Sequence, residues 1–164
     1  MSCTSEDSSL CAHNEHNVDV LRVRFTPRQD MTKPSSVKSL VKFIGRIEPG
    51  IPVILWAGIP CTGGSIVQNA NKHLPDHDER MQRHHSLWRK LWNGFNVVAK
   101  AVRARDEGHV VIEWPTSCAY WKHPEVIRLL SGDEWSDTRL SGCAYGLCLT
   151  EGKNKGKFMA KAWR

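Results

Sequence analysis

Runs of hydrophobic residues, some alternating with polar ones and some continuous, predict where the strands of this chain lie. Residues 18–25 alternate apolar and polar side chains, as a strand with one buried face does. Residues 51–57 and 110–115 are largely apolar, which is typical of strands covered on both faces. Residues 138–150 and 156–163 are expected to form two strands joined by a turn rich in Gly and Lys.

Three other segments place apolar residues at the spacing of a helix. The first is expected to start at Ser35 or Ser36, either of which can cap a helix, and to end before residues 48–50. The second covers residues 80–105, and the third begins near Pro124, a residue favoured in the first helical turn. On the second helix the apolar face consists of Leu87, Leu91, Phe95, Val98 and Val102, widened by Trp88 and Trp92.

Strands that alternate with helices along a chain indicate a parallel sheet with helices on both faces. We therefore expect an α/β fold, a Rossmann-like three-layer sandwich with a mostly parallel sheet and an antiparallel C-terminal hairpin. Residues 1–17 are rich in Ser, Asp, Glu and Asn and are expected to form a disordered tail, so the domain covers residues 18–164. Residues 58–79 form a long polar loop, which in a small domain is usually functional or mobile.

Composition and charge narrow the class of protein. The chain has 164 residues, 40% hydrophobic and 24% charged, which suits a globular domain with its own core. No run approaches the ~20 apolar residues of a membrane helix, and the N-terminus lacks the basic start and apolar run of a secretory signal. We therefore expect an intracellular protein, in the nucleus or the cytoplasm and not on a membrane, with six free thiols. The net charge of +6 favours nucleic acid as a partner.

Two of the predicted strands end in residues that carry chemistry. One leads into Pro60, Cys61 and a Thr-Gly-Gly-Ser sequence, and the other ends at Glu113. Ligands of parallel sheets bind beyond the carboxyl ends of the strands, where both residues lie. A free thiol is only slightly ionised at neutral pH, and the backbone N–H groups of Gly63 and Gly64 are expected to stabilise the thiolate. A carboxylate that directly follows buried residues is costly unless it is paired.

These paired strand ends resemble the catalytic half of the cytosine carbon-5 methyltransferases, over about residues 53–163. In that family a Pro-Cys turn after one strand supplies a thiol that attacks carbon-6 of cytosine, and a Glu at the end of the next strand holds the base. The resemblance implies that Cys61 is the nucleophile, that Glu113 contacts the base, and that DNA is the partner. Residues 141–147 and the basic residues after them look like retroelement-type members. The residues implied to contact the flipped base are Pro60, Thr62, Gly63, Ser65, Trp114 and Trp121.

The sequence departs from the family on the side that binds S-adenosylmethionine. The family's Phe-x-Gly-x-Gly loop does not occur, and Trp-Pro follows Glu113 where the family has Asn. The family's Gln-x-Arg-x-Arg strand is missing too, since Arg103 and Arg105 have that spacing but lie in a predicted helix. The resemblance therefore implies S-adenosylmethionine as cofactor without a loop to bind it, and a partner chain would supply the missing half.

Basic residues gather near the start of the second predicted helix. Positive charge there opposes the helix dipole by about 0.3–1 kcal/mol per charge, and contacts with nucleic-acid phosphates would offset that cost. A solvated helix face is the alternative. The residues expected to bind nucleic acid are Arg80, Arg83, His84 and Arg89.

Other interpretations of the same residues stay open. Cys61 can be an ordinary buried thiol, and Glu113 can be a structural partner of an Arg or of backbone N–H groups. Four candidate zinc ligands lack the closely paired spacing of structural zinc sites, so no metal is expected. These candidates are Cys118, His123, Cys143 and Cys148. The alternative function is a catalytically silent structural or nucleic-acid-binding subunit of a larger assembly.

Overall fold

A computed structural model describes residues 30–145, 148, 153, 155–157 and 162–164. The expected tail at 1–17 and the expected strand at 18–25 lie outside the described residues. The chain divides into two compact units, and the second of them, Met31–Arg164, contains every described element.

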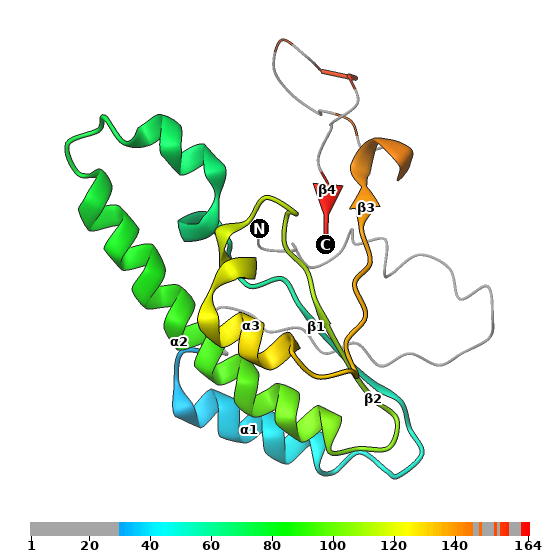
Figure 1. Ribbon diagram of the computed structural model, residues 1–164. Coiled ribbons are helices and arrows are strands. Elements are labelled where there is room, and N and C mark those ends of the chain that lie inside the picture. The colour runs from blue at the N-terminus through cyan, green and yellow to red at the C-terminus, as the bar shows by residue number, and fades with distance from the viewer. Residues whose placement is uncertain (1–29, 146–147, 149–152, 154, 158–161) are drawn as a thin grey trace. The chain divides into compact units, whose positions relative to one another are not determined.

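This unit combines helices with two small sheets (Figure 1). The helices are α1 (Pro34–Ile44), α2 (His77–Arg103) and α3 (Pro124–Leu130). The strands are β1 (Val53–Ala57), β2 (Gly108–Ile112), β3 (Leu140–Ser141) and β4 (Ala162–Trp163). Short 3-10 helices are η2 (Thr62–Gly64), η3 (Ile66–Asn71), η4 (Ala119–Lys122) and η5 (Gly142–Tyr145). None of the described helices is long and apolar enough to cross a membrane.

The sheets confirm the coarse prediction of parallel strands joined by a helix and a C-terminal antiparallel pair. Strands β1 and β2 are parallel, in a register that pairs Val53 with Gly108 and Ala57 with Ile112, and α2 is the crossover between them. Strands β3 and β4 are antiparallel. Within the described residues each sheet has only two strands, so a three-layer sandwich is not confirmed.

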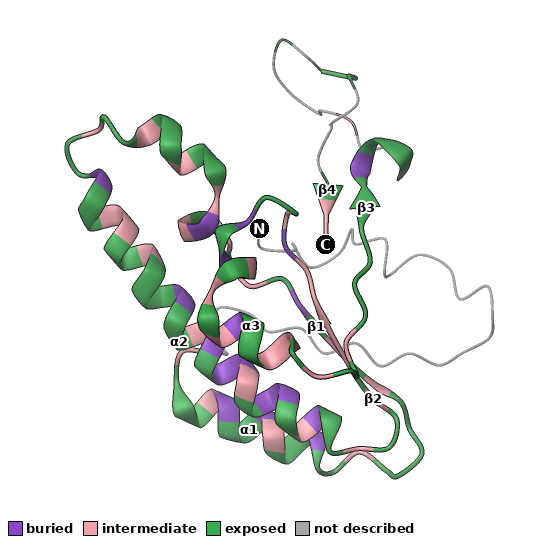
Figure 2. Cartoon of the chain, in the orientation of Figure 1, coloured by how far each residue is buried: buried purple, intermediate pink, exposed green. Residues whose placement is uncertain are grey.

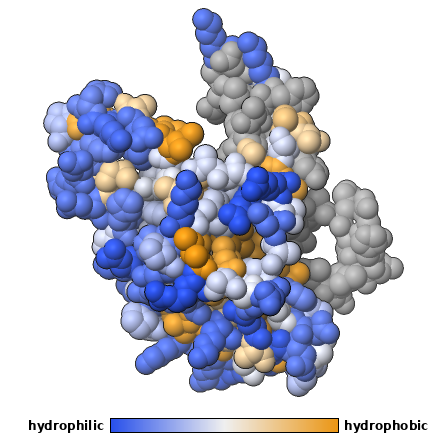
Figure 3. Space-filling view, viewed as in Figure 1, coloured by the Kyte–Doolittle hydropathy of each residue, from blue (hydrophilic) through white to orange (hydrophobic). Residues whose placement is uncertain are grey.

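Exposed residues alternate along β1 with more buried ones (Figure 2), so this strand buries one face only. Leu55 and Ile112 pack against the core beside α2, whereas Ile54 and Trp56 are 64% and 58% exposed. The prediction that β1 is covered on both faces is therefore wrong for the described residues. An apolar run shows that a strand favours burial, but it does not show whether a second layer is present to cover it. Elsewhere in the view of Figure 3, polar side chains cover most of α1 and α2, and apolar side chains form separate patches.

Helix α2 forms the centre of the core. Trp88 and Trp92 stack with ring centroids 5.6 Å apart, and Trp88 stacks on Tyr120 at 4.4 Å. These tryptophans, expected at the margin of the apolar face, are 2% and 0% exposed, while Leu87 is 44% exposed. Large rings exclude more water than leucine does, so they take the centre of the buried face. A second cluster joins α1 to α2 through Val37, Leu40, Ile44, Val98 and Val102.

The helix ends differ from the predictions in ways that the backbone explains. Helix α1 begins at Pro34 with Lys33 as N-cap, and neither Ser35 nor Ser36 caps it. Proline suits the first helical position because its fixed φ is already helical and its missing N–H is not needed there. Helix α3 begins at Pro124, as predicted.

Arg105 lies beyond the end of α2 and not within the helix. Its guanidinium donates hydrogen bonds to backbone carbonyls in the connection between α1 and β1. The acceptors are the carbonyl oxygens of Ile44 at 3.2 Å, Ile47 at 3.0 Å, Glu48 at 2.7 Å and Ile51 at 3.4 Å. Arg105 therefore has a structural role, separate from the strand ends.

Candidate functional site at the ends of β1 and β2

The carboxyl ends of β1 and β2 bring the predicted site residues to one edge of the sheet. Because the strands are parallel, the chain leaves both of them on the same side. The N–H of Glu113 donates to the carbonyl of Ala57 at 3.0 Å and continues the ladder by one step. Trp114 Nε1 donates to the carbonyl of Ile59 at 2.6 Å and so links the segment that follows β2 to the segment that follows β1.

Cys61 begins a tight turn at this edge. It is the N-cap of η2, and its carbonyl accepts a hydrogen bond from the N–H of Gly64 at 2.9 Å. That N–H is therefore not directed at the Cys61 sulfur, contrary to the expectation that it would stabilise a thiolate. Ser65 ends this turn and caps η3 by accepting from the N–H of Val67 at 3.3 Å. The segment expected to be one long polar loop thus contains two 3-10 helices.

The two glycines of the turn let it lie directly on the residues that follow β2. A Cβ at Gly64 would lie 2.9 Å from Cys118 Sγ and 3.0 Å from the ring of Tyr120. A Cβ at Gly63 would collide with the Tyr120 hydroxyl. Cys61 therefore has a defined neighbour after β2, and that neighbour is Cys118.

Cys61 and Cys118 form a hydrogen-bonded pair of thiols. Cys118 is 4% exposed, while Cys61 is half-buried. The hydrogen bond to Cys61 and then burial raise the pKa of the Cys118 thiol far above its usual value. Cys118 therefore stays protonated, and its S–H is available as a donor to the sulfur of Cys61. Burial, with smaller contributions from both sulfurs, raises the pKa of Tyr120 to about 12, so its hydroxyl also stays protonated.

The sequence indicated Cys118 as a residue beyond the second strand and as a zinc candidate, but it did not predict this contact. A signal was available, because Cys118 follows the second strand just as Cys61 follows the first. Among the described residues, no group of three or more His, Cys, Asp or Glu is placed to hold a metal ion.

Glu113 occupies the other side of the strand ends. Its Oε2 accepts a hydrogen bond from Trp56 Nε1 at 3.0 Å, and Trp56 lies on the exposed face of β1. Cys61, by contrast, packs against the core cluster that includes Cys118. The structure thus brings the carboxylate and the thiol to the same edge but places them toward different faces of the sheet.

The two tryptophans expected to contact a base differ in access. Trp114 is 1% exposed and has Trp92 and Trp121 at centroid distances of 5.8 Å and 4.9 Å, so its ring is not open to a base. Trp121 is half-buried, donates Nε1 to the carbonyl of Pro115, and carries the Arg164 guanidinium 4.9 Å from its ring centroid. Of the remaining predicted base contacts, Pro60 and Thr62 are exposed.

The basic residues of α2 are partly neutralised within the helix. Arg80 lies 3.5 Å from an Asp76 oxygen, and Arg83 binds Glu79 at 2.6 Å. Helix α2 begins at His77, with Asp78 and Glu79 in its first turn. These acidic residues favour the helix dipole, which corrects the expectation that the first turn is unfavourably charged.

Two residues further along α2 differ from this paired group. His84 is half-buried, and its Cβ would lie 3.2 Å from a Cβ at Gly63 in the turn after Cys61. Arg89 is exposed and has no ion pair among the described residues. Burial and then the neighbouring charges of His84, Arg89 and His123 lower the pKa of His85. Arg89 is therefore the basic residue of this face with the greatest freedom to contact a phosphate.

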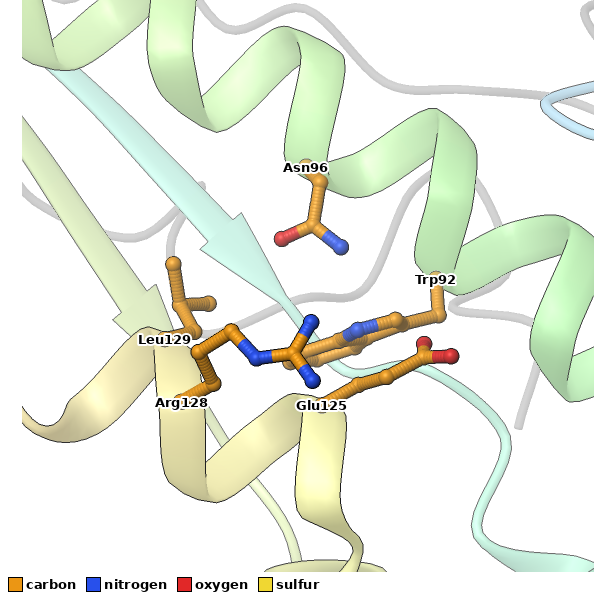
Figure 4. Close-up of a pocket in the computed structure, with 5 residues that line it drawn as sticks. All are labelled: Trp92, Asn96, Glu125, Arg128 and Leu129. Atoms are coloured by element: carbon orange, nitrogen blue, oxygen red, sulfur yellow. The ribbon is translucent and has the colours of Figure 1, made fainter.

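Two hollows in the surface lie away from the strand ends. One of ≈ 410 Å³ lies between α2 and α3, where Glu125 and Arg128 extend toward the ring of Trp92 (Figure 4). Another of ≈ 520 Å³ adjoins it along α2. Neither hollow is lined by Cys61 or Glu113.

The described residues do not fit S-adenosylmethionine at this edge. In the turn after β1, the space beside Gly63 and Gly64 is filled by Tyr120 and Cys118, so the turn cannot cradle a cofactor. Comparison with protein-family models, curated proteins and solved structures finds no match to this chain.

Proposed function

We propose that residues 53–163 form the base-engaging half of a domain that resembles the cytosine carbon-5 methyltransferases and acts on DNA. Cys61 is the nucleophile and Glu113 the base contact in this proposal. The observation that carries it is the position of Cys61 and Glu113 just beyond the carboxyl ends of two paired parallel strands. The hydrogen bond between Cys61 and Cys118 supports it, because a sulfur that accepts a hydrogen bond is better stabilised as a thiolate, which is the nucleophilic form.

The proposed chemistry is a reversible addition. The Cys61 thiolate forms a bond to carbon-6 of a cytosine, and the electron pair of the ring double bond takes a proton from water at carbon-5. Loss of the original carbon-5 hydrogen and breakage of the carbon–sulfur bond then restore the cytosine and the thiolate. Glu113 would hold the ring nitrogen, for which its carboxylate must turn from Trp56 Nε1 toward the sheet edge.

The parts of the family's fold that have no counterpart here indicate what a partner chain would supply. The described residues at the strand ends do not fit S-adenosylmethionine, so no methyl-transfer step is assigned to this chain alone. We infer that β1, α2 and β2 belong to a Rossmann-like three-layer sandwich completed by a partner chain. The apolar face that bears Ile54 and Trp56 supports this inference, since it lacks a covering layer among the described residues. A DNA substrate would place the protein in the nucleus or the cytoplasm.

Hydrogen exchange at carbon-5 tests the nucleophile without any cofactor. We expect the full chain to exchange the carbon-5 hydrogen of cytosine in single-stranded DNA for deuterium in heavy water, as read by mass spectrometry of the nucleosides. Cys61→Ser should abolish the exchange. Cys118→Ala, which removes the S–H donor, should slow it roughly tenfold or more, since a hydrogen bond to a charged group contributes about 1.5–3 kcal/mol. S-adenosylmethionine should leave the rate unchanged, and equal rates for the wild-type chain and Cys61→Ser would refute the nucleophile.

Arg89 provides a test of DNA binding by α2. We expect Arg89→Glu to weaken binding to DNA and to reduce the slope of log affinity against log salt by about 1, because one phosphate contact is lost. The matched control is Arg139→Glu, which changes the net charge equally at a residue that is 73% exposed and lies 3.9 Å from Asp137. Fluorescence anisotropy over a salt series measures both slopes. If the two variants behave alike, total charge and not the α2 face governs binding.

A second candidate function is a catalytically silent nucleic-acid-binding subunit. The Trp56–Glu113 hydrogen bond and the buried ring of Trp114 favour it, because both take expected base contacts away from the edge. Its signature is binding to DNA that depends on Arg89 without exchange at carbon-5. The two experiments together therefore separate the candidates.

A further inference from the structure

The Cys61–Cys118 pair has a chemical property beyond nucleophilic attack. Neither thiol is in a disulfide, one is half-buried and the other buried, and they follow neighbouring parallel strands. Cys61 packs against the buried cluster that contains Cys118, and the two thiols share a hydrogen bond. The close approach of Gly64 to Cys118 fixes the turn that carries Cys61 against its partner. Two adjacent sulfurs with different access to solvent are the arrangement that reversible thiol oxidation requires.

We propose that Cys61 and Cys118 are a site of reversible oxidative modification, at which hydrogen peroxide converts the two thiols into a disulfide. Cys61 is the residue oxidised first because it is more accessible than Cys118. Cys118 is the resolving residue because it already contacts the Cys61 sulfur. This inference does not rest on the proposed function, since the pair needs neither DNA nor a cofactor to react.

The reaction balances with peroxide as the only oxidant. The Cys61 sulfur attacks one peroxide oxygen, the O–O bond breaks, and hydroxide leaves to give a sulfenic acid. The Cys118 sulfur then attacks the Cys61 sulfur, the S–S bond forms, and the S–O bond breaks. The departing hydroxide takes the Cys118 proton as water. Two thiols and one peroxide thus give one disulfide and two waters, and a dithiol reductant reverses the change.

Oxidation has a direct consequence for the strand ends. A disulfide would join the turn after β1 to the segment after β2 and would remove the Cys61 thiolate as a nucleophile. The redox state of the pair would therefore switch off the attack on a base wherever that attack occurs.

The test oxidises the reduced full chain with hydrogen peroxide, blocks remaining thiols with N-ethylmaleimide, and maps peptides by mass spectrometry. We expect a linked peptide that joins Cys61 to Cys118 and disappears after reduction. In Cys118→Ser, the Cys61 sulfenic acid should accumulate and be trapped by dimedone. Gly64→Ala should lower the yield of the linked peptide several-fold, because the new methyl group displaces Cys118 Sγ. Gly58→Ala is the matched control, since a Cβ there meets nothing within 4 Å.

Two results would overturn the proposal. One is complete blocking of both thiols after peroxide treatment, with no linked peptide. The other is a Cys61–Cys118 link no more frequent than links to the exposed Cys143, which would show random pairing. The comparison of the wild-type chain with Cys118→Ser decides the matter if Gly64→Ala fails to fold. The carbon-5 exchange assay is run under reduction, so either proposal can fail while the other stands.

Discussion

Replacing Trp92 with alanine is expected to lower the free energy of unfolding by about 3–5 kcal/mol. Trp92 is 0% exposed, and its ring has Trp88, Phe95 and Trp114 at centroid distances of 5.6 Å, 5.2 Å and 5.8 Å. Trp88 and Phe95 lie on α2, and Trp114 follows β2. The cavity would therefore open where the helix packs against the residues that follow the strand. Neighbours anchored in two elements cannot all move in to fill it, which keeps the cost high.

Urea denaturation followed by circular dichroism measures this loss. The matched control is Trp56→Ala, which removes the same side chain from a position that is 58% exposed and breaks one hydrogen bond to Glu113. Its cost should be about 1 kcal/mol or less. Equal losses for the two variants would mean that Trp92 does not form the centre of the core.

Replacing Gly108 with alanine is expected to lower the free energy of unfolding by about 3 kcal/mol. Gly108 is the first residue of β2 and pairs with Val53. A Cβ there would overlap the carbonyl oxygen of Val102, lie 2.7 Å from its carbonyl carbon and lie 3.1 Å from the Arg105 oxygen. All three atoms belong to the backbone of the last turn of α2 or of the residues just after it, so relief requires moving the helix away from the strand.

The control for this substitution is Gly58→Ala. A Cβ at Gly58 meets nothing within 4 Å, so the change should alter stability by no more than about 0.5–1 kcal/mol and can raise it by restricting the unfolded chain. Thermal unfolding of both variants provides the comparison. If the Gly108→Ala protein is as stable as the Gly58→Ala protein, Gly108 does not pack closely against the backbone at the end of α2.

The sequence predicted the elements better than it predicted their surroundings. Helical spacing located α1, α2 and α3 because the buried residues of an amphipathic helix recur every three or four positions in the sequence. The apolar run of β1 could not reveal that Trp56 stays exposed, since coverage depends on a layer elsewhere in the chain or in a partner. The N-cap at Lys33 was missed because Pro34 at the first helical position outweighs a serine one or two residues later.

The site was predicted in position but not in its contacts. Strand order and the Pro-Cys turn placed Cys61 and Glu113 at one edge, and the parallel register of β1 and β2 confirms that placement. The position of Cys118 after the second strand hinted at the partner of Cys61, but their contact depends on the packing of the Gly63–Gly64 turn on Tyr120, which the sequence does not show. The sequence did not show the direction of the Glu113 side chain either, since that direction depends on the hydrogen bond from the ring nitrogen of Trp56.

The guanidinium of Arg105 joins the connection between α1 and β1 to the residues that follow α2. Four backbone carbonyls accept hydrogen bonds from its two terminal nitrogens. Urea and guanidinium ions solvate peptide groups and therefore compete for these carbonyls. Denaturants of this kind are expected to loosen the connection by replacing the donors that Arg105 supplies.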